Sequence, residues 1–397
     1  MRRLAAGVLC LAWLSLAQAQ EVTVTNSATL RQAVRAAQPG ARILLAPGDY
    51  PGGVYLENIH GTAAAPIVIG AADPAQPPRF VGGTEALHLS DVSYLELHNL
   101  VITGQTGNGL NLDDGGSFDT PAHHVTLANL VVLDIGPTGN HDGIKLSGLD
   151  DFVIRDCQLE RWGDGGSGVD MVGCHRGLIE GCHFQAREGG GSNAIQSKGG
   201  TRDLVIRGNR FDNAGARAIN IGGSTGLRFF RPQVGDLPVE GFEAKDITVE
   251  GNVFIGSQAP LAFVGVDGAV VRFNTIVMPT KWALRILQET VLPEFVPCRK
   301  GVFTDNIIVF RSDWWGEGGC NIGPNTAPET FRFARNVWFC QDRPDRSRPT
   351  LPTAEEDGVY GADPQFVDAD NGDYTLKPGS PAAGHGHTAL PAAGAVL

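Results

Sequence analysis

Nine short segments of this chain end in nearly the same way, and this repetition restricts the fold more than any other feature. In each segment a run of branched or aromatic residues leads to Asn or Cys, and apolar residues follow, as in LVIRGNRF and ITVEGNVF. The repeated positions are Asn99, Asn129, Cys157, Cys182, Asn209, Asn252, Asn274, Asn306 and Asn336. A strand-forming unit that recurs every few tens of residues is typical of a β-solenoid, in which each coil contacts only its neighbours.

The chain divides into three parts around this repeat. In residues 1–19, two arginines at positions 2 and 3 precede an apolar stretch that ends in Ala-Gln-Ala, which is the pattern of a secretory signal peptide. Residues 20–340 are expected to form the solenoid, and residues 341–397 a C-terminal loop and terminal segment. Residues 27–38 place apolar side chains at helical spacing, so we expect a short helix, capped by Ser27, that covers the N-terminal end of the core.

Composition and charge narrow the class of protein further. The net charge of −12 argues against a nucleic-acid-binding surface, and any polyanionic ligand would need a local cluster of basic residues. No segment is long and apolar enough to span a membrane. We therefore expect a secreted or periplasmic monomer without a membrane span.

The cysteines leave two alternatives open, because an exported protein can form disulfides. Cys157 and Cys182 occupy equivalent positions on adjacent coils, where they either stack in the core as thiols or form a bridge. A disulfide between two of Cys298, Cys320 and Cys340 fits the loop-rich sequence around them. No cysteine spacing resembles a zinc site.

A second strand family lies between the repeated segments, and its outward residues form a polar column. Its members are GLNLDD (109–114), GIKLSG (143–148), GVDMVG (168–173), AIQSKG (194–199), AINIGG (218–223), PLAFVG (260–265) and ALRILQ (283–288). Strand alternation predicts that one outward column contains Asn111, Lys145, Asp170, Gln196, Asn220, Ala262 and Arg285.

A column of small residues lies two positions earlier, and alternation predicts that it also faces outward. It contains Gly109, Gly143, Gly168, Ala194, Ala218, Pro260 and Ala283. A bare column beside a polar one would form a trough for an extended polymer, walled by the long excursion at residues 226–245. The alternative is that small residues suit the turn before each strand, and that outward residues are polar because they contact water.

Several charged residues near this column could carry chemistry. Lys198 ends its strand beside Gln196, and Arg217 follows about one coil later. A lysine near another cation can act as a base, although a lysine in a solvated turn is an equally ordinary reading. His141, Asp142 and Asp164 lie at strand entries, where carboxylates bind calcium, act as acid and base, or close Asx turns.

Two segments resemble the alginate lyase/chondroitinase B family of polysaccharide lyases, in the pectin-lyase-like superfamily. They are residues 28–85 and the stretch NAIQSKGGTRDLVIRGNRFDNAGARAINIGG. The resemblance implies an all-β, single-stranded right-handed parallel β-helix that cleaves an acidic polysaccharide by β-elimination, with Lys198 at the position of the family's lysine. The family's arginine falls on Asn220, three residues after Arg217. The acidic residues that bind calcium in many members are replaced by residues 191–193, so calcium is not supported and no cofactor is expected.

A weaker resemblance links NHDGIKLSG and the following GDGG to motifs of polygalacturonase-type glycoside hydrolases, through Asp142 and Asp164. The paired aspartates, the GHG and the R-x-K of those hydrolases are missing, so hydrolysis by that route is not expected.

The sequence therefore favours an exported polysaccharide lyase acting on a uronate-containing polysaccharide. Lys198 would be the base, and Arg217 or Arg285 would stabilise the substrate carboxylate. The expected substrate-binding residues are Asn111, His141, Asp142, Lys145, Asp170, Gln196 and Asn220. The main alternative is a glycan-binding or surface-structural β-helix without catalysis, and hydrolase or epimerase chemistry is a further one.

Overall fold

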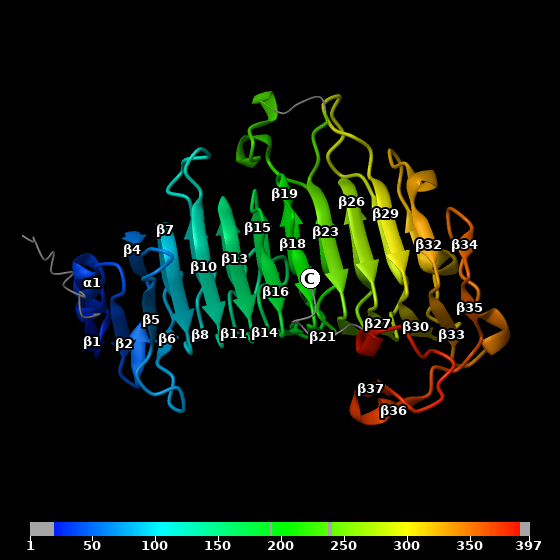
Figure 1. Cartoon of the computed structure of the whole chain (residues 1–397), viewed down its shortest axis with the longest axis horizontal. Helices are drawn as coiled ribbons and strands as arrows, with labels where there is room; N and C mark the ends of the chain where they lie inside the picture. The colour runs from blue at the N-terminus through cyan, green and yellow to red at the C-terminus, as the bar shows by residue number, and fades with distance from the viewer. Residues whose placement is uncertain (1–19, 191–192, 237–239, 390–397) are drawn as a thin grey trace, which may run out of the picture.

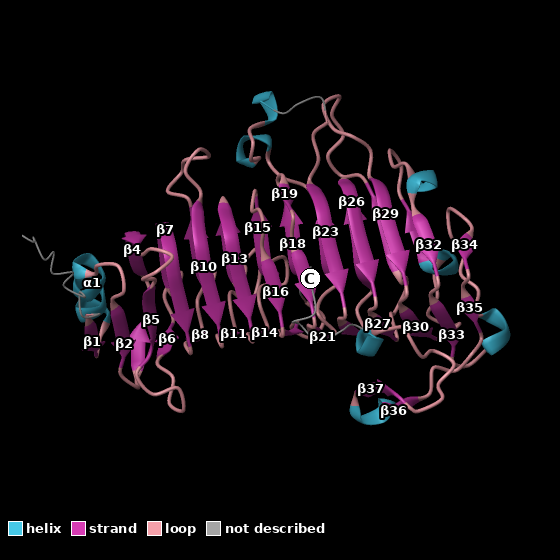
Figure 2. Cartoon of the chain, viewed as in Figure 1, coloured by secondary structure: helices cyan, strands magenta, loops and turns pink. Residues whose placement is uncertain are grey.

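Three parallel ladders of strands wind into one long β-helix (Figures 1 and 2). The computed structural model describes residues 20–190, 193–236 and 240–389, so the expected signal peptide lies outside the described residues. Helix α1 (Ser27–Ala36) covers the N-terminal end and buries Leu30 and Val34. Asn26, not Ser27, caps this helix, because its side chain accepts a hydrogen bond from the Thr29 N–H at 2.9 Å. The expected all-β solenoid with one capping helix is confirmed.

A central coil runs through the groove ladder, then the second ladder and then the third ladder, whereas the first and last coils lack a strand in the groove ladder. The groove ladder, named for the cavity described below, contains β4 (Val54–His60), the first half of β7 (Leu87–His98), β9 (Leu110–Asp113), β12 (Ile144–Ser147), β15 (Ser167–Val172), β18 (Asn193–Lys198), β22 (Arg217–Gly222), β25 (Ala259–Val264), β28 (Leu284–Leu287) and β31 (Cys320–Ile322). The second ladder contains β1 (Glu21–Val24), β2 (Arg42–Leu45), β5 (Ile67–Ala71), the second half of β7, β10 (Ala122–Ala128), β13 (Leu149–Arg155), β16 (Leu178–Glu180), β19 (Thr201–Arg202), β20 (Val205–Arg207), β23 (Ala244–Glu250), β26 (Val266–Arg272), β29 (Arg299–Thr304), β32 (Arg332–Ala334) and β34 (Glu355–Glu356). The third ladder contains β3 (Asp49–Pro51), β6 (Arg79–Val81), β8 (Val101–Thr103), β11 (Val131–Leu133), β14 (Gln158–Glu160), β17 (His183–Gln185), β21 (Arg210–Asp212), β24 (Val253–Ile255), β27 (Thr275–Val277), β30 (Ile307–Phe310), β33 (Val337–Cys340) and β35 (Val359–Tyr360).

The turn between the second and third ladders contains one residue with a left-handed backbone. Asn129, Asp156 and Gly208 have φ values of 54°, 53° and 61° at this position. Asn, Asp and Gly tolerate this conformation better than other residues do. Asn99 and Asn129 belong to this turn position, so aligning them with Cys157 was wrong by one residue. Leu130 occupies the position equivalent to Cys157, since its N–H points to the Cys157 sulfur at 3.5 Å.

The residue after this turn forms a buried asparagine ladder in the C-terminal half of the helix. The backbone N–H of Asn209 donates to Asn252 Oδ1 at 2.9 Å, and the N–H of Asn252 donates to Asn274 Oδ1 at 3.0 Å. The same contact continues through Asn306 to Asn336. Each amide satisfies a backbone donor that the turn would otherwise leave unpaired inside the core. These side chains therefore stack along the helix axis and fix the register of successive coils.

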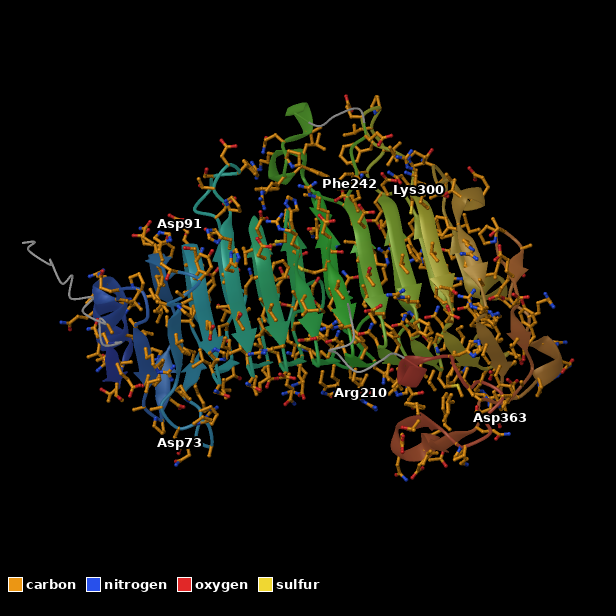
Figure 3. The ribbon with its side chains drawn as sticks, in the orientation of Figure 1. Asp73, Asp91, Arg210, Phe242, Lys300 and Asp363 are labelled. Carbon is orange, nitrogen blue, oxygen red and sulfur yellow. The ribbon has the colours of Figure 1, made fainter. Side chains whose placement is uncertain are left out.

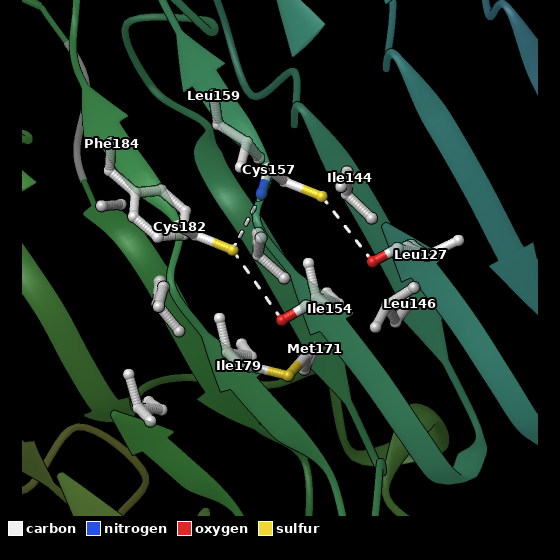
Figure 4. Close-up of a cluster of buried hydrophobic side chains, with 14 of the residues drawn as sticks. Leu127, Ile144, Leu146, Ile154, Cys157, Leu159, Met171, Ile179, Cys182 and Phe184 are labelled. Atoms are coloured by element: carbon white, nitrogen blue, oxygen red, sulfur yellow. Dashed lines mark hydrogen bonds between the residues drawn. The ribbon is translucent and has the colours of Figure 1, made fainter. Parts of the chain in front are cut away.

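Sulfur replaces the amide in the two preceding coils. Cys157 and Cys182 are free buried thiols, and the Cys157 N–H donates to the Cys182 sulfur at 3.4 Å (Figure 4). The Cys182 N–H donates in turn to Asn209 Oδ1 at 2.9 Å, so the ladder is continuous across the change of residue type. Stacked thiols, rather than a bridge, are therefore found here. Cys298 and Cys340 are also free thiols, so the disulfide expected among the last three cysteines was wrong.

The C-terminal segment folds back along the helix after β35. It carries the hairpin of β36 (Phe366–Asp368) and β37 (Asp373–Leu376), and the Arg210 guanidinium donates to the Gly372 carbonyl at 3.1 Å. Figure 3 shows Arg210 at the lower edge beside this segment, whereas Asp91, Phe242 and Lys300 lie along the upper edge, from which the longest loops rise. Within the described part of the chain, no helix has the length and apolarity to cross a membrane.

Replacing Asn252 by alanine should destabilise the protein by about 2–6 kcal/mol. The substitution leaves the buried Asn209 N–H and the Ile206 carbonyl without their partners, and each buried unsatisfied group costs about 1–3 kcal/mol. Urea unfolding followed by circular dichroism measures the change. The exposed Asn140→Ala variant is the control, and an equal shift in both variants would contradict a structural role for the ladder.

Candidate functional site

The outer face of the groove ladder carries the predicted polar column in register. Lys145 pairs with Asn111 on one side and with Asp170 on the other, and Gln196 lies between Asp170 and Asn220. Ala262 and Arg285 follow on β25 and β28. The register prediction is therefore confirmed, and neighbouring members of the column lie about 4.8 Å apart along the helix axis.

The predicted trough of small residues was wrong, because those residues point into the core. Ala194, Ala218 and Ala283 are fully buried in the main apolar cluster. A Cβ on Gly168 would lie 3.2 Å from Phe184 and 3.3 Å from Trp162, and both of these side chains belong to the buried core. The chain bends at this small residue, so strict alternation fails at the start of the strand. The next outward side chain therefore lies three positions before the polar column rather than two.

This bend creates a second polar row that contacts the first. The pairs have a spacing of three: Asn108 Nδ2 donates to Asn111 Oδ1 at 3.0 Å, and Arg217 Nη1 donates to Asn220 Oδ1 at 3.0 Å. Asn193 Nδ2 lies 3.4 Å from Gln196 Oε1. The same three-residue spacing in consecutive strands was visible in the sequence, but Asn108, Ser167 and Asn193 were missed because alternation was applied to the whole strand.

Two lysines share one buried carboxylate at the centre of the two rows. Asp170 is 1% exposed, and its Oδ2 bonds Lys145 while its Oδ1 lies 3.3 Å from Lys198 Nζ. Lys198 Nζ also donates to Gln196 Oε1 at 3.3 Å. Burial alone would lower the pKa of Lys145, but the charges of Asp170 and Asp142 outweigh burial and raise it. Lys145 is therefore a cation at neutral pH.

Asp142 is the second buried carboxyl of this cluster. Its Oδ1 accepts the Ser167 N–H at 2.8 Å, and its Oδ2 lies 3.8 Å from Lys145 Nζ. Burial, followed by the charge of Asp170, raises the pKa of Asp142 to about 7. The cluster of two lysines and two aspartates thus changes its net charge close to neutral pH.

Lys145 and Lys198 lie on the floor of a cavity of about 870 Å³. Tyr55, His88 and Asp113 line the end of the cavity toward the N-terminus. The loop after β9 supplies Phe118, and the loop after β22 supplies Thr225, Arg228, Phe229 and Arg231. Both loops rise from the upper edge of the helix in Figure 1. The long excursion after residue 223 therefore forms one wall, as the sequence predicted.

The loop after β22, called the wall loop below, is anchored beside Lys198 by Glu243, which is fully buried. Its carboxylate accepts hydrogen bonds from the Gly199 N–H at 2.9 Å, the Thr225 N–H at 3.0 Å and the Thr225 hydroxyl at 2.7 Å, and also from the Thr290 hydroxyl. Arg231 adds a second anchor, because Nη1 donates to Asp150 Oδ1 at 2.7 Å. The local sequence gave no sign of Glu243, since its partners lie 18 to 47 residues away along the chain.

The acidic end of the cavity is built around His88. Its Nε2 lies 2.5 Å from Asp113 Oδ2, and its Nδ1 lies 3.1 Å from Glu85 Oε2. Asn111 bonds the same glutamate. The Tyr55 ring also lines this end of the cavity and makes an edge contact with His88 at 5.1 Å.

The other predicted residues lie outside the cavity lining. Arg217 is one coil beyond Lys198 and pairs with Glu289 at 3.0 Å. Arg285 stacks on Trp282 at 4.6 Å and donates to Asn321 at 2.8 Å. The His141 ring packs against the turn that contains Gly136 and Gly139.

Asp164 closes a turn on the exposed surface, where its Oδ1 accepts the Gly139 N–H at 2.6 Å. It therefore does not join buried Asp142 in a facing pair of carboxylates. Residues 191 and 192, two of the three positions at which the resemblance would place calcium ligands, lie outside the described residues. No cluster of three or more His, Cys, Asp or Glu side chains suited to a metal occurs in the described ranges.

Replacing Asp142 by asparagine should flatten the dependence of stability on pH. The unfolded carboxyl titrates near 3.9 and the folded one near 7, so between these values the folded state holds a proton that the unfolded state has lost. Protonated Asp142 therefore favours the folded state at low pH. The free energy of unfolding falls by up to about 1.4 kcal/mol per pH unit as the pH rises toward 7. Urea unfolding between pH 5 and 8 measures the slope.

The exposed Asp164→Asn variant is the matched control, because it also keeps an acceptor for a backbone N–H. Equal slopes in the Asp142→Asn variant and the parent would show that Asp142 is ionised throughout this range.

Comparisons with known proteins support the fold. Residues 85–254 match a family model described as a right handed beta helix region, which confirms the expected handedness. A PL6 family polysaccharide lyase from Pseudopedobacter saltans has a TM-score of 0.55 at 14% identity, over 93% of this chain and 99% of that one. An alginate lyase from Paenibacillus sp. str. FPU-7 has a TM-score of 0.51 at 18% identity, over 77% and 96%.

The same fold also occurs in a glycosidase. The GH136 lacto-N-biosidase from Eubacterium ramulus has a TM-score of 0.53 at 13% identity, over 84% of this chain and 64% of that one. A comparison with curated proteins finds no match. At these identities the likeness concerns the fold alone, so the chemistry has to be argued from the residues of the site. The chain is similar to these enzymes in being a right-handed parallel β-helix.

Proposed function

We propose that this protein is an exported polysaccharide lyase that cleaves a uronate-containing polysaccharide by β-elimination. The observation that carries the proposal is the pair of Lys145 and Lys198 on buried Asp170, at the floor of the cavity. Successive strands of the groove ladder line the cavity, and its two central lysines supply the cations that a polyanion would contact on a protein of net charge −12.

The substrate carboxylate would bind at Lys145. This lysine is held in place by Asp170 and Asp142, and it remains a cation at neutral pH. An ammonium at the carboxylate makes the adjacent C–H more acidic, because it stabilises the negative charge that develops when the proton leaves. Arg217 and Arg285, which the sequence suggested for this role, are engaged outside the cavity lining. Lys145 replaces them in the proposal.

Lys198 would act as the base. Its neutral amine takes the proton from the carbon next to the carboxylate, the electrons of that C–H bond form the C=C double bond, and the C–O bond to the neighbouring sugar breaks. The ammonium formed on Lys198 can return its proton to the leaving oxygen, so charge and atoms balance.

A glycan-binding protein without catalysis is the second candidate, and the ion pair between Lys198 and Asp170 favours it. A lysine that stays paired with a buried carboxylate stays protonated and cannot accept a proton. Such a protein would use the two lysines to bind uronates and would leave the chain intact. Formation of unsaturated products distinguishes the two candidates.

Replacing Lys198 by alanine should lower the rate of product formation by about 10²–10⁴-fold, the range expected for loss of a general base. The assay is the ultraviolet absorbance of unsaturated uronates on alginate, polygalacturonate and chondroitin sulfate. Lys377→Ala, which removes an exposed lysine of the C-terminal segment, is the matched control. Full activity in Lys198→Ala would remove Lys198 from the mechanism. Binding without any product in the parent protein would favour the second candidate.

A further inference from the structure

The cavity around Lys198 is closed on one side, and from this we infer that the protein binds and cuts its polysaccharide from a chain end. This inference rests on the proposed function for the cutting step, but not for the binding geometry. It concerns where the polymer can run on either side of Lys198. The outer face of the groove ladder differs sharply between the two sides.

The side toward the N-terminus is open. Lining residues come from β4, β7, β9, β12, β15 and β18 in succession, and Tyr55 at the far end is 49% exposed. The strand pairing from Tyr55 through His88, Asn111, Lys145 and Asp170 to Gln196 contains five steps. At about 4.8 Å per step this path is roughly 24 Å long, which accommodates several sugar units.

On the side toward the C-terminus, the residues of the next two strands that continue the polar column are buried. Asn220 on β22 is 1% exposed, and Ala262 and Val264 on β25 are completely buried, although both β25 side chains belong to the outward-facing set. Of the described residues, none from β22, β25 or β28 lines the cavity. A polymer that passed over Lys198 would therefore meet protein instead of a continuing groove.

Backbone and two loops form this barrier. The chain rises at Gly223 directly over the column, where a Cβ would lie 2.5 Å from Gln196 Nε2 and 3.4 Å from Asn220 Nδ2. Behind it, the ion pair between Arg217 and Glu289 joins β22 to the loop after β28 at 3.0 Å.

The wall loop and the loop after β28 support each other above this point. The Phe230 and Phe295 rings meet edge to face at 5.1 Å, and the Gly241 N–H donates to the Glu294 carbonyl at 2.7 Å. Buried Glu243 accepts bonds from Thr225 of one loop and from Thr290 of the other. The described parts of the two loops thus form one connected wall, and its contacts are buried or backbone-mediated.

The first experiment follows product size and polymer length together on alginate, polygalacturonate and chondroitin sulfate. Cutting from an end should release short unsaturated oligosaccharides from the earliest time points, while viscosity falls only as total product accumulates. A rapid fall in viscosity while product absorbance is still low would overturn the inference and leave the lyase function intact. Absence of unsaturated product on all three polymers would instead overturn the proposed function.

The second experiment tests the geometry without catalysis. The Lys198→Ala variant is titrated with size-fractionated samples of the same polymers, and the stoichiometry is measured by analytical ultracentrifugation. End binding predicts one protein per polysaccharide chain at every chain length. A number of bound proteins that rises with chain length would overturn the inference, whether or not the parent protein is a lyase.

The Glu289→Ala variant tests the barrier itself. Removing this carboxylate breaks the ion pair with Arg217, so longer unsaturated products should appear and viscosity should fall earlier than with the parent. Glu329→Ala, which removes an exposed glutamate elsewhere, is the matched control. An unchanged product distribution in Glu289→Ala would show that the ion pair is not part of the barrier.

Discussion

The hydrogen bonds that satisfy the backbone at one buried turn determine how each coil from Cys157 onward sits on the next. From Cys157 to Asn336, a side chain of one coil accepts the backbone N–H of the coil before it. A slip of one residue would leave these donors unpaired in the core and would turn every strand over. This constraint is far from the cavity, yet it brings Lys145, Asp170 and Gln196 into neighbouring positions on the opposite face.

Burial then decides what these neighbours can do. Asp170 and Asp142 are almost inaccessible, so their carboxylates interact with the two lysines above them rather than with water. A buried carboxylate with two cations holds both ammonium groups in fixed positions, which a solvated ion pair would not do. The cost of this arrangement appears in the raised pKa of Asp142, since its ionised form is the one that burial disfavours. The same four residues therefore determine the position of the cations and the charge of the cavity floor.

Much of the fold and part of the site could be predicted from the sequence, and the failures have physical causes. The polar column was predicted because its residues lie inside regular strands, where side chains alternate. The bend at Gly143, Gly168 and Ala194 breaks that alternation, so the row of Asn108, Ser167 and Asn193 was missed and a trough was predicted in its place. Asn129 was aligned with Cys157 because asparagine suits both a left-handed turn and the ladder position after it.

Long-range contacts account for the rest of what the sequence did not show. Glu243 joins segments that are adjacent only because the coil returns, and nothing in its local sequence distinguishes it from a surface glutamate. The loops that wall and close the cavity all emerge from the same edge of the helix (Figure 1). A solenoid can lengthen a turn without disturbing its ladders, because each coil packs only on its neighbours. The strands of this protein therefore fix the positions of the charged groups, whereas the loops after β9, β22 and β28 determine which part of a polymer can reach them.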